Sequence, residues 1–265
     1  MTDVPILLTA TVVLACLALP LAVGAVLHRG ARAAGLGHRR ASRLGWTAGL
    51  VLAAWLAVTA AVGGVGLYAA DPWLGIGVAL PLVLGLLALR LSAVTAALSD
   101  VRAPAALAAV QVVRVVGVVF LALLALDLLP PGFAVPAGTG DVLVGLLAPV
   151  VAYALWRRQS RPALGIAFNA LGLLDLVVAI PLGLLHAPGR LQLIVTEPTA
   201  GIMGLLPMAL IPTFVVPLAI VLHVASLRLL VGPGRPDSKG DVVGVRRHDR
   251  SRSPSTVTSP PVDRA

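Results

Sequence analysis

Long runs of apolar residues alternate with short polar segments along the 265-residue chain. Each run approaches the roughly 20 residues with which a helix crosses about 30 Å of hydrocarbon. This pattern predicts an all-α fold, a polytopic membrane helix bundle of seven transmembrane helices within residues 1–230. The predicted spans cover about residues 5–27, 45–68, 74–98, 105–127, 140–156, 163–185 and 203–228.

The positions of the basic residues predict how this bundle is oriented. Every Lys and Arg except Arg114 and Arg190 falls in alternate connections, at the span ends beside them, or after residue 230. Because cytoplasmic loops accumulate Lys and Arg, we expect the N-terminus outside and the C-terminus inside. Residues 231–265 are rich in Pro, Gly, Ser, Arg and Asp, which predicts a disordered basic cytoplasmic tail.

Composition limits the class of protein. With 58% hydrophobic and 12% charged residues, the chain has too little polar surface for a soluble domain, so a lipid bilayer is its expected partner. The net charge of +9 is assigned to topology rather than to nucleic acid, and the basic tail is a candidate contact for anionic lipid. The bias toward Ala, Val, Leu and Gly, with Arg in place of Lys, indicates a bacterial source and hence the bacterial cytoplasmic membrane.

Catalytic and metal-binding motifs are not found in the sequence. Cys16 is the one cysteine, which excludes a disulfide framework and a metal site built on cysteines. His223 has no second histidine at a metal-ligand spacing, and we interpret it as an interfacial histidine near the inner end of the last span. No GxSxG or SxxK pattern marks a serine nucleophile. We therefore predict no catalytic residue, no metal and no cofactor, and an enzyme is the least expected class.

Two ionisable side chains lie deep within predicted spans. Arg114 and Asp175 stand on the fourth and sixth spans, which run in the same direction, and residue counting places them within roughly 5 Å of the same height. A charge at mid-bilayer requires a partner or a water-filled cavity. We predict an Arg114–Asp175 ion pair, with Gln111 and Asn169 as neighbouring hydrogen-bond partners. The pair either fixes helix packing or forms a site for a solute or a proton.

Asp141 has a different predicted position, in the first turn of the fifth span. There Thr139 would cap the helix, and the helix dipole would stabilise the carboxylate. The alternative is a cation or substrate site at the outer mouth, formed with Asp127 or Glu197.

Three prolines interrupt the last predicted span at intervals of five residues. Each removes a backbone donor and obstructs the carbonyl four residues earlier, which predicts a kinked or broken helix. Broken helices at membrane depth occur only against protein or water. The prolines are Pro207, Pro212 and Pro217.

Four motifs in the second half of the chain resemble a group of uncharacterised bacterial multi-pass integral membrane proteins. They are Gln111 with Arg114, the loop LPPGFAVPAGTGD at Leu129 to Asp141, the helix NALGLLDL at Asn169 to Leu176, and the ending LIPTFVVPLAIVLH at Leu210 to His223. The resemblance implies a shared fold and no particular reaction.

Together these features favour a small-solute or ion-coupled transporter, or an accessory subunit of one. Gln111, Arg114, Asn169 and Asp175 would form its internal site, and Asp141 a weaker site at the outer mouth. The alternative is a structural or sensory membrane protein whose basic tail docks a partner.

Overall fold

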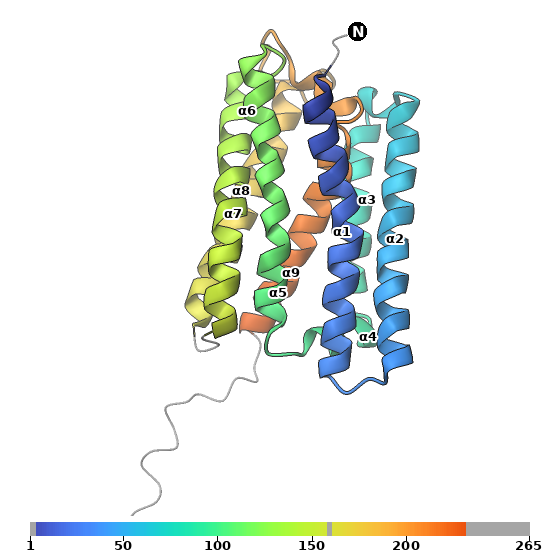
Figure 1. The fold of residues 1–265 in the computed structure, drawn as a ribbon. Helices are drawn as coiled ribbons and strands as arrows, with labels where there is room; N and C mark the ends of the chain where they lie inside the picture. Colours follow the sequence, from blue (N-terminus) through green and yellow to red (C-terminus); the bar gives the residue numbers. More distant parts are fainter. Residues whose placement is uncertain (1–3, 158–160, 232–265) are drawn as a thin grey trace, which may run out of the picture. The chain divides into compact units, whose positions relative to one another are not determined.

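The computed structural model describes residues 4–157 and 161–231, and all regular structure in these two ranges is helical. Except for Val231, the predicted tail lies outside the described residues. Figure 1 shows the helices running side by side. The elements are α1 (Ile6–Ala33), α2 (His38–Gly64), η1 (Leu67–Ala69), α3 (Trp73–Ala88), α4 (Ser92–Leu98), α5 (Ala103–Val110), η2 (Gln111–Gly117), α6 (Val118–Ala125), α7 (Pro131–Arg157), α8 (Pro162–His186), η3 (Ala200–Gly204), η4 (Ile211–Val215) and α9 (Val216–Val231).

Six helical stretches of the described chain are long and apolar enough to cross a membrane, and α3 with α4 makes a seventh only if the bent pair is one span. The prediction of one helix over 74–98 is wrong, because α3 and α4 meet at an angle of 77°. Gly30 of α1 allows α4 to pack there, since a side chain on Gly30 would collide with the backbone of Ala97. α4 therefore turns under α1 instead of continuing along α3.

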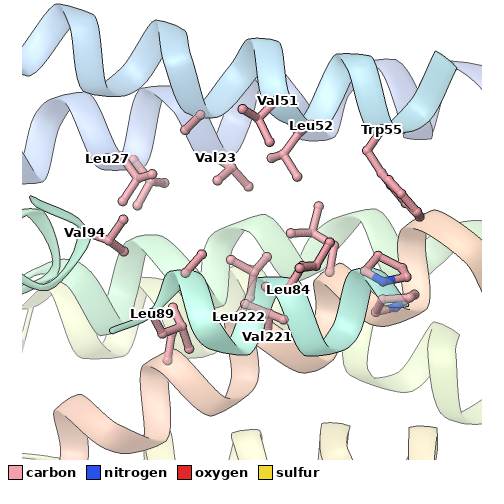
Figure 2. Close-up of a pocket in the computed structure, with 18 of the residues that line it drawn as sticks. Val23, Leu27, Val51, Leu52, Trp55, Leu84, Leu89, Val94, Val221 and Leu222 are labelled. Atoms are coloured by element: carbon pink, nitrogen blue, oxygen red, sulfur yellow. The ribbon is translucent and has the colours of Figure 1, made fainter. Parts of the chain in front are cut away.

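The N-terminal hairpin of α1 and α2 packs through small residues. A Cβ atom on Gly24 would lie 2.8 Å from the carbonyl oxygen of Gly45, so glycine is needed for this approach. Only 17% of the most apolar stretch of α2 is buried, because α2 packs along α1 and does not pack along α3. The space between α2 and α3 is an apolar chamber of about 350 Å³, with walls from α1, α2, α3, α4, α5 and α9 (Figure 2).

The C-terminal half is packed more closely. α5, η2 and α6 form one continuous helical stretch whose most apolar window is 56% buried, and the same fraction holds for η4 with α9. α7 lies against η2 and α8, and α8 lies against α9. Phe120 of α6 and Phe133 of α7 have ring centroids 5.6 Å apart within this core. These helices hold the buried polar residues of the site.

The last predicted span is broken, as its prolines indicated, but the helix begins later than residue 203. Residues 205–209 are not helical, η4 is a π-helical turn that contains Pro212, and Pro217 lies at the start of α9. The indole of Trp55 on α2 donates a hydrogen bond of 3.2 Å to the carbonyl of Thr213 in this turn. Packed protein thus satisfies a backbone group at the break.

Basic residues gather at one end of the described helices, where α1 ends and α2 begins (Figure 1). We call this the arginine end. Arg114 and Arg190 are the described exceptions: Arg114 is buried within η2, and Arg190 lies in the connection after α8. The opposite end carries the start of α1, the turn at η1, and the connections from α6 to α7 and from α8 to η3.

Candidate functional site

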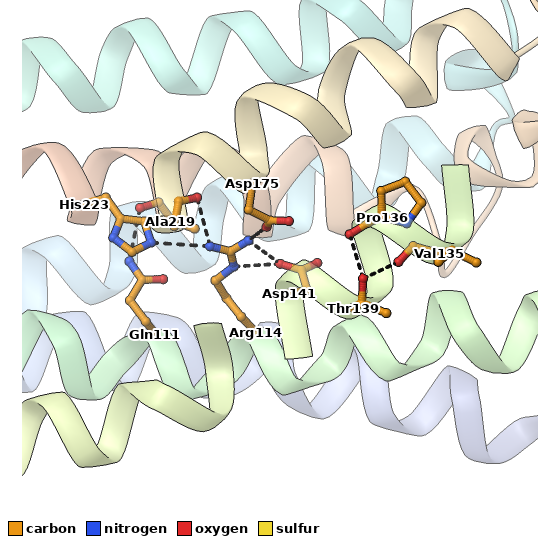
Figure 3. Close-up of polar contacts among 10 residues, drawn as sticks. Gln111, Arg114, Val135, Pro136, Thr139, Asp141, Asp175, Ala219 and His223 are labelled. Atoms are coloured by element: carbon orange, nitrogen blue, oxygen red, sulfur yellow. Dashed lines mark hydrogen bonds and ion pairs between the residues drawn. The ribbon is translucent and has the colours of Figure 1, made fainter. Parts of the chain in front are cut away.

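Arg114 is the centre of a buried polar cluster in the C-terminal half. It lies on η2, a 3₁₀ turn in the middle of the α5–α6 stretch, and is 1% exposed. Its Nε donates to Oδ1 of Asp141 at 2.6 Å, its Nη1 donates to the carbonyl of Gly172 at 3.1 Å, and its Nη2 forms an ion pair with Asp175 (Figure 3). The ion pair predicted between Arg114 and Asp175 is therefore present, and a second carboxylate completes it.

Asp141 is not at the mouth of a helix. α7 begins at Pro131, so residues predicted as an outer loop are helical and Asp141 lies in its third turn, 8% exposed. Proline is well suited to the first position of a helix, where its missing N–H has no partner to lose. Thr139 does not cap the helix, since its hydroxyl donates to the carbonyl of Val135 at 2.6 Å. The predicted cap is therefore wrong, and Asp141 lies deeper in the helix than the predicted outer mouth.

The acids that were predicted to join Asp141 at an outer mouth lie elsewhere. Asp127 is exposed just after α6, with a positive φ of 55°, and Glu197 is exposed in the connection before η3. Neither forms a hydrogen bond or ion pair with Asp141 in the described part of the chain. The carboxylate of Asp141 belongs instead to the Arg114 cluster.

His223 on α9 connects Asn169 to Arg114. The amide nitrogen of Asn169 donates to the carbonyl of Gly165 at 2.7 Å and to the hydroxyl of Ser226 at 2.9 Å, so the amide oxygen faces Nδ1 of His223 at 2.9 Å. This assigns the ring proton to Nδ1, because an amide oxygen only accepts. Nε2 is then the acceptor 3.5 Å from Nη1 of Arg114.

Gln111 and Asn169 do not contact the ion pair directly, contrary to the prediction. Gln111 donates from Nε2 to the carbonyl of Ala219 at 3.2 Å, while its Oε1 is buried with no hydrogen-bond partner. Asn169 reaches Arg114 only through His223. His223 is fully buried, and its membership of the cluster was not predicted from the sequence.

Glycines make room for the charged groups. A Cβ atom on Gly140 of α7 would overlap the carboxylate of Asp175. One on Gly172 of α8 would overlap the ring of His223 and lie 3.2 Å from Nη1 of Arg114. The backbones of α7 and α8 thus approach the cluster at positions where even an alanine would displace a polar side chain.

The cluster contains one positive and two negative groups. When both carboxylates are ionised, Arg114 balances one charge and the site carries a net charge of −1. If these helices cross a membrane, an uncompensated charge at this depth would be costly, and one bound proton or one further cation would balance it. Among the described residues, no group of three His, Cys, Asp or Glu side chains is placed to hold a metal ion.

Asp141 also forms part of the wall of a cavity of about 270 Å³. Its other lining residues come mainly from α3, α7, α8 and η4 and are apolar, for example Phe133, Leu176 and Ile211. A second cavity of about 280 Å³ lies at the end of the bundle opposite the arginine end, and Asp71 is one of its lining residues. The two cavities share the lining residues Leu74, Gly75, Leu184 and Ala187, so they adjoin.

Comparison with known proteins places the chain in a family. Residues 71–231 match the domain of unknown function DUF8737. The chain belongs to this family. The match begins before α3 and includes α3–α9, so it extends beyond the second half in which the four motifs lie, and it contains every residue of the cluster. No curated protein and no solved structure showed significant similarity to the chain.

Proposed function

We propose that the chain is a proton-coupled transporter of the bacterial cytoplasmic membrane, and that Arg114, Asp141 and Asp175 form its coupling site. In this proposal α3 and α4 together make one of seven spans, the N-terminus is outside, and the arginine end faces the cytoplasm. The gathering of basic residues at one end supports that orientation.

The observation that carries the proposal is a pair of carboxylates that share one arginine inside the apolar bundle. A purely structural ion pair needs one acid for one base, and the second acid leaves a negative charge that a proton or cation must balance. Binding and release of that proton would change the charge of the site by one unit. Charge changes of this kind are the basis of proton relays in membrane transporters.

The cavity beside Asp141 supports a solute of a particular chemistry. Its walls are apolar except for this carboxylate, and its volume of about 270 Å³ is near the lower limit for small-molecule sites. A small, mainly apolar cation fits both properties. It would bind at Asp141 as the proton leaves, so that one positive charge replaces another and the site stays neutral.

The cavities also support an access route from the outside. They adjoin one another between Asp141 and the end that we assign to the outside, whereas toward the arginine end the site borders the hydrogen-bonded chain of His223, Asn169 and Ser226. The described conformation would therefore be outward-facing. Transport then requires the hydrogen-bonded chain of His223, Asn169 and Ser226 to move. The irregular turns η2 and η4 lie in the spans beside this chain.

Reconstitution into liposomes that contain a pH-sensitive dye tests the proposal. Tetramethylammonium, tetraethylammonium and choline are suitable probes, because they are permanently charged and carry no proton across lipid themselves. We expect an outside-to-inside gradient of at least one probe to drive proton release from the liposomes. Asp141→Asn should abolish the release, and Asp127→Asn, an exposed acid outside the cluster, should leave it unchanged.

Two results would contradict the proposal. One is that none of these cations drives proton movement, and the other is equal proton movement in the Asp141→Asn and Asp127→Asn variants. Removal of residues 232–265 tests the structural or sensory alternative, which depends on a tail outside the described residues. A transporter should keep its flux without that tail, and a docking protein should lose its partner.

A further inference from the structure

The apolar chamber between the hairpin of α1 and α2 and the helices α3 and α9 is separate from the Arg114 cluster. Its lining contains no ionisable residue. Figure 2 shows Val51, Leu52 and Trp55 of α2 facing Leu84 of α3 across the chamber, with Val221 and Leu222 of α9 behind. A ligand of this chamber must therefore be hydrocarbon along most of its length.

The chamber is open on the side where α2 and α3 do not pack together. Several of its wall residues are largely exposed there: Val51 is 62% exposed, Leu84 51% and Leu91 59%. If these helices cross a membrane, this opening faces the acyl chains of the lipid. Lipid can therefore enter from the side, without passing through the bundle.

The length of the chamber matches one leaflet. Along α2 its lining runs from Leu44 to Trp55, which corresponds to about 16 Å of helix axis. This is close to half of the roughly 30 Å hydrocarbon thickness of a bilayer. The chamber begins at the arginine end and stops near the middle of the bundle, where Trp55 bonds to η4.

Basic residues adjoin the chamber where it begins at the arginine end, and we call this part its mouth. Arg90 stands between the lining residues Leu89 and Leu91, and Arg40 lies one helical turn before the lining residue Leu44. Arg40, Arg43 and Arg90 are exposed, and within the described ranges none of them forms an ion pair. The mouth of the chamber is therefore complementary to a negatively charged headgroup.

We propose that the chamber binds one acyl chain of an anionic phospholipid from the leaflet at the arginine end, and that Arg40, Arg43 and Arg90 bind its phosphate-containing headgroup. The proposal does not depend on the transport proposal, since no residue of the Arg114 cluster lines the chamber. α4 forms the floor of the chamber through Val94 and Leu98, and it holds the acyl chain between α1 and α3.

Photolabelling of the full chain in nanodiscs tests the acyl-chain contact. The probe is phosphatidylglycerol with a diazirine in one acyl chain, and we expect labelled peptides from α2 and α3. Ala48 lines the chamber, so Ala48→Trp should fill it and lower the labelling of α3 several-fold. Ala53→Trp is the matched control, because Ala53 is exposed on α2 and does not line the chamber.

A second comparison uses wild-type protein and tests the headgroup. Phosphatidylcholine with the same diazirine chain should label α3 less than phosphatidylglycerol. The combined variant Arg40→Gln, Arg43→Gln and Arg90→Gln should remove this preference. Each arginine that contacts the headgroup should account for a roughly fivefold difference in labelling between the two lipids. Arg102→Gln, Arg157→Gln and Arg161→Gln remove equal charge from the same end and should preserve the preference. Arg102 lies over Trp156 of α7, and no residue of α7 lines the chamber.

Equal labelling by the two lipids would overturn the anionic headgroup assignment. Equal labelling of the Ala48→Trp and Ala53→Trp variants would overturn the chamber as the acyl-chain site. A dimer that dissociates only in Ala48→Trp would show that a second copy of the chain, rather than lipid, covers the opening.

Discussion

The two halves of the described chain use small residues for different purposes. In the hairpin, Gly24 and Gly45 bring α1 and α2 together, and the outer face of α2 and the chamber are left to apolar surroundings. In the C-terminal half, Gly140 and Gly172 make room for Asp175 and His223. Neither use leaves room for an added atom: in the hairpin it would meet the backbone of the facing helix, and in the C-terminal half it would displace polar side chains from their partners.

The two halves should therefore differ in how substitutions affect their stability. An apolar interface in lipid has no hydrophobic driving force of its own and depends on packing. A buried charge cluster depends on complete pairing, since the loss of one member leaves the others uncompensated. Substitutions of the paired charged residues in the C-terminal half should therefore have larger and more specific effects than substitutions of exposed apolar residues in the hairpin.

The largest effect is expected for Arg114→Met. This change leaves Asp141 and Asp175 buried without a cation, and breaking a buried pair in this way costs about 3–5 kcal/mol. Denaturation in mixed micelles measures the loss. Adding Asp141→Asn and Asp175→Asn to Arg114→Met should recover part of it, and no recovery would mean that the arginine acts through packing rather than charge.

Gly172→Ala should be the next most damaging change. The new methyl group would overlap the ring of His223 and crowd Arg114, and overpacking of this kind costs about 1–3 kcal/mol. Gly75→Ala on α3 is the control, since nothing lies within 4 Å of its added Cβ atom. Equal unfolding free energies for the two variants would contradict the role given to Gly172.

Asp175→Asn should have a smaller effect on stability and a large effect on proton coupling. The amide keeps a hydrogen-bond acceptor for Arg114, and Asp141 still balances the arginine, so we expect a loss of about 1 kcal/mol. The proton movement measured in liposomes should disappear. A variant that is as stable as wild type and still couples protons would show that Asp141 alone carries the proton.

Trp55→Phe should have the smallest effect. It removes one hydrogen bond between the halves, from the indole to Thr213, and such bonds in membrane bundles contribute about 0.6 kcal/mol. Thermal unfolding in detergent measures this difference. A loss as large as that of Gly172→Ala would contradict the distinction between the two halves.

Residue counting was sufficient for the Arg114–Asp175 pair because the 3₁₀ turn η2 adds only a small extra rise before Arg114. Two parallel spans can be compared in depth from sequence positions alone, and a deep charge must have a partner. The same method failed for Asp141, because its depth depends on where α7 begins. Pro130, Pro131 and Gly132 were interpreted as a turn, although Pro131 is compatible with the first position of a helix and is the signal that was available.

His223 shows a different limit. Its predicted height was given relative to the inner end of the last span, and α9 is one α-helix from Val216 to Val231, so that height does not reveal its neighbours. Its contacts with Asn169 and Arg114 depend on how α9 is rotated against α8. Apolar runs contain no information about that rotation, because every face of such a helix is hydrophobic.

The sequence by itself determined that the described chain is helical, that its long helices suit a membrane, and that Arg114 needs an acid at its own depth. These follow from hydropathy, charge and the fixed rise of a helix, which are local properties. Only the tertiary structure decided that two acids share the arginine, that His223 joins them, that α4 turns under α1, and that a chamber opens between α2 and α3. Each of these depends on which helix faces meet, and glycine contacts and backbone breaks far apart in the chain set those faces.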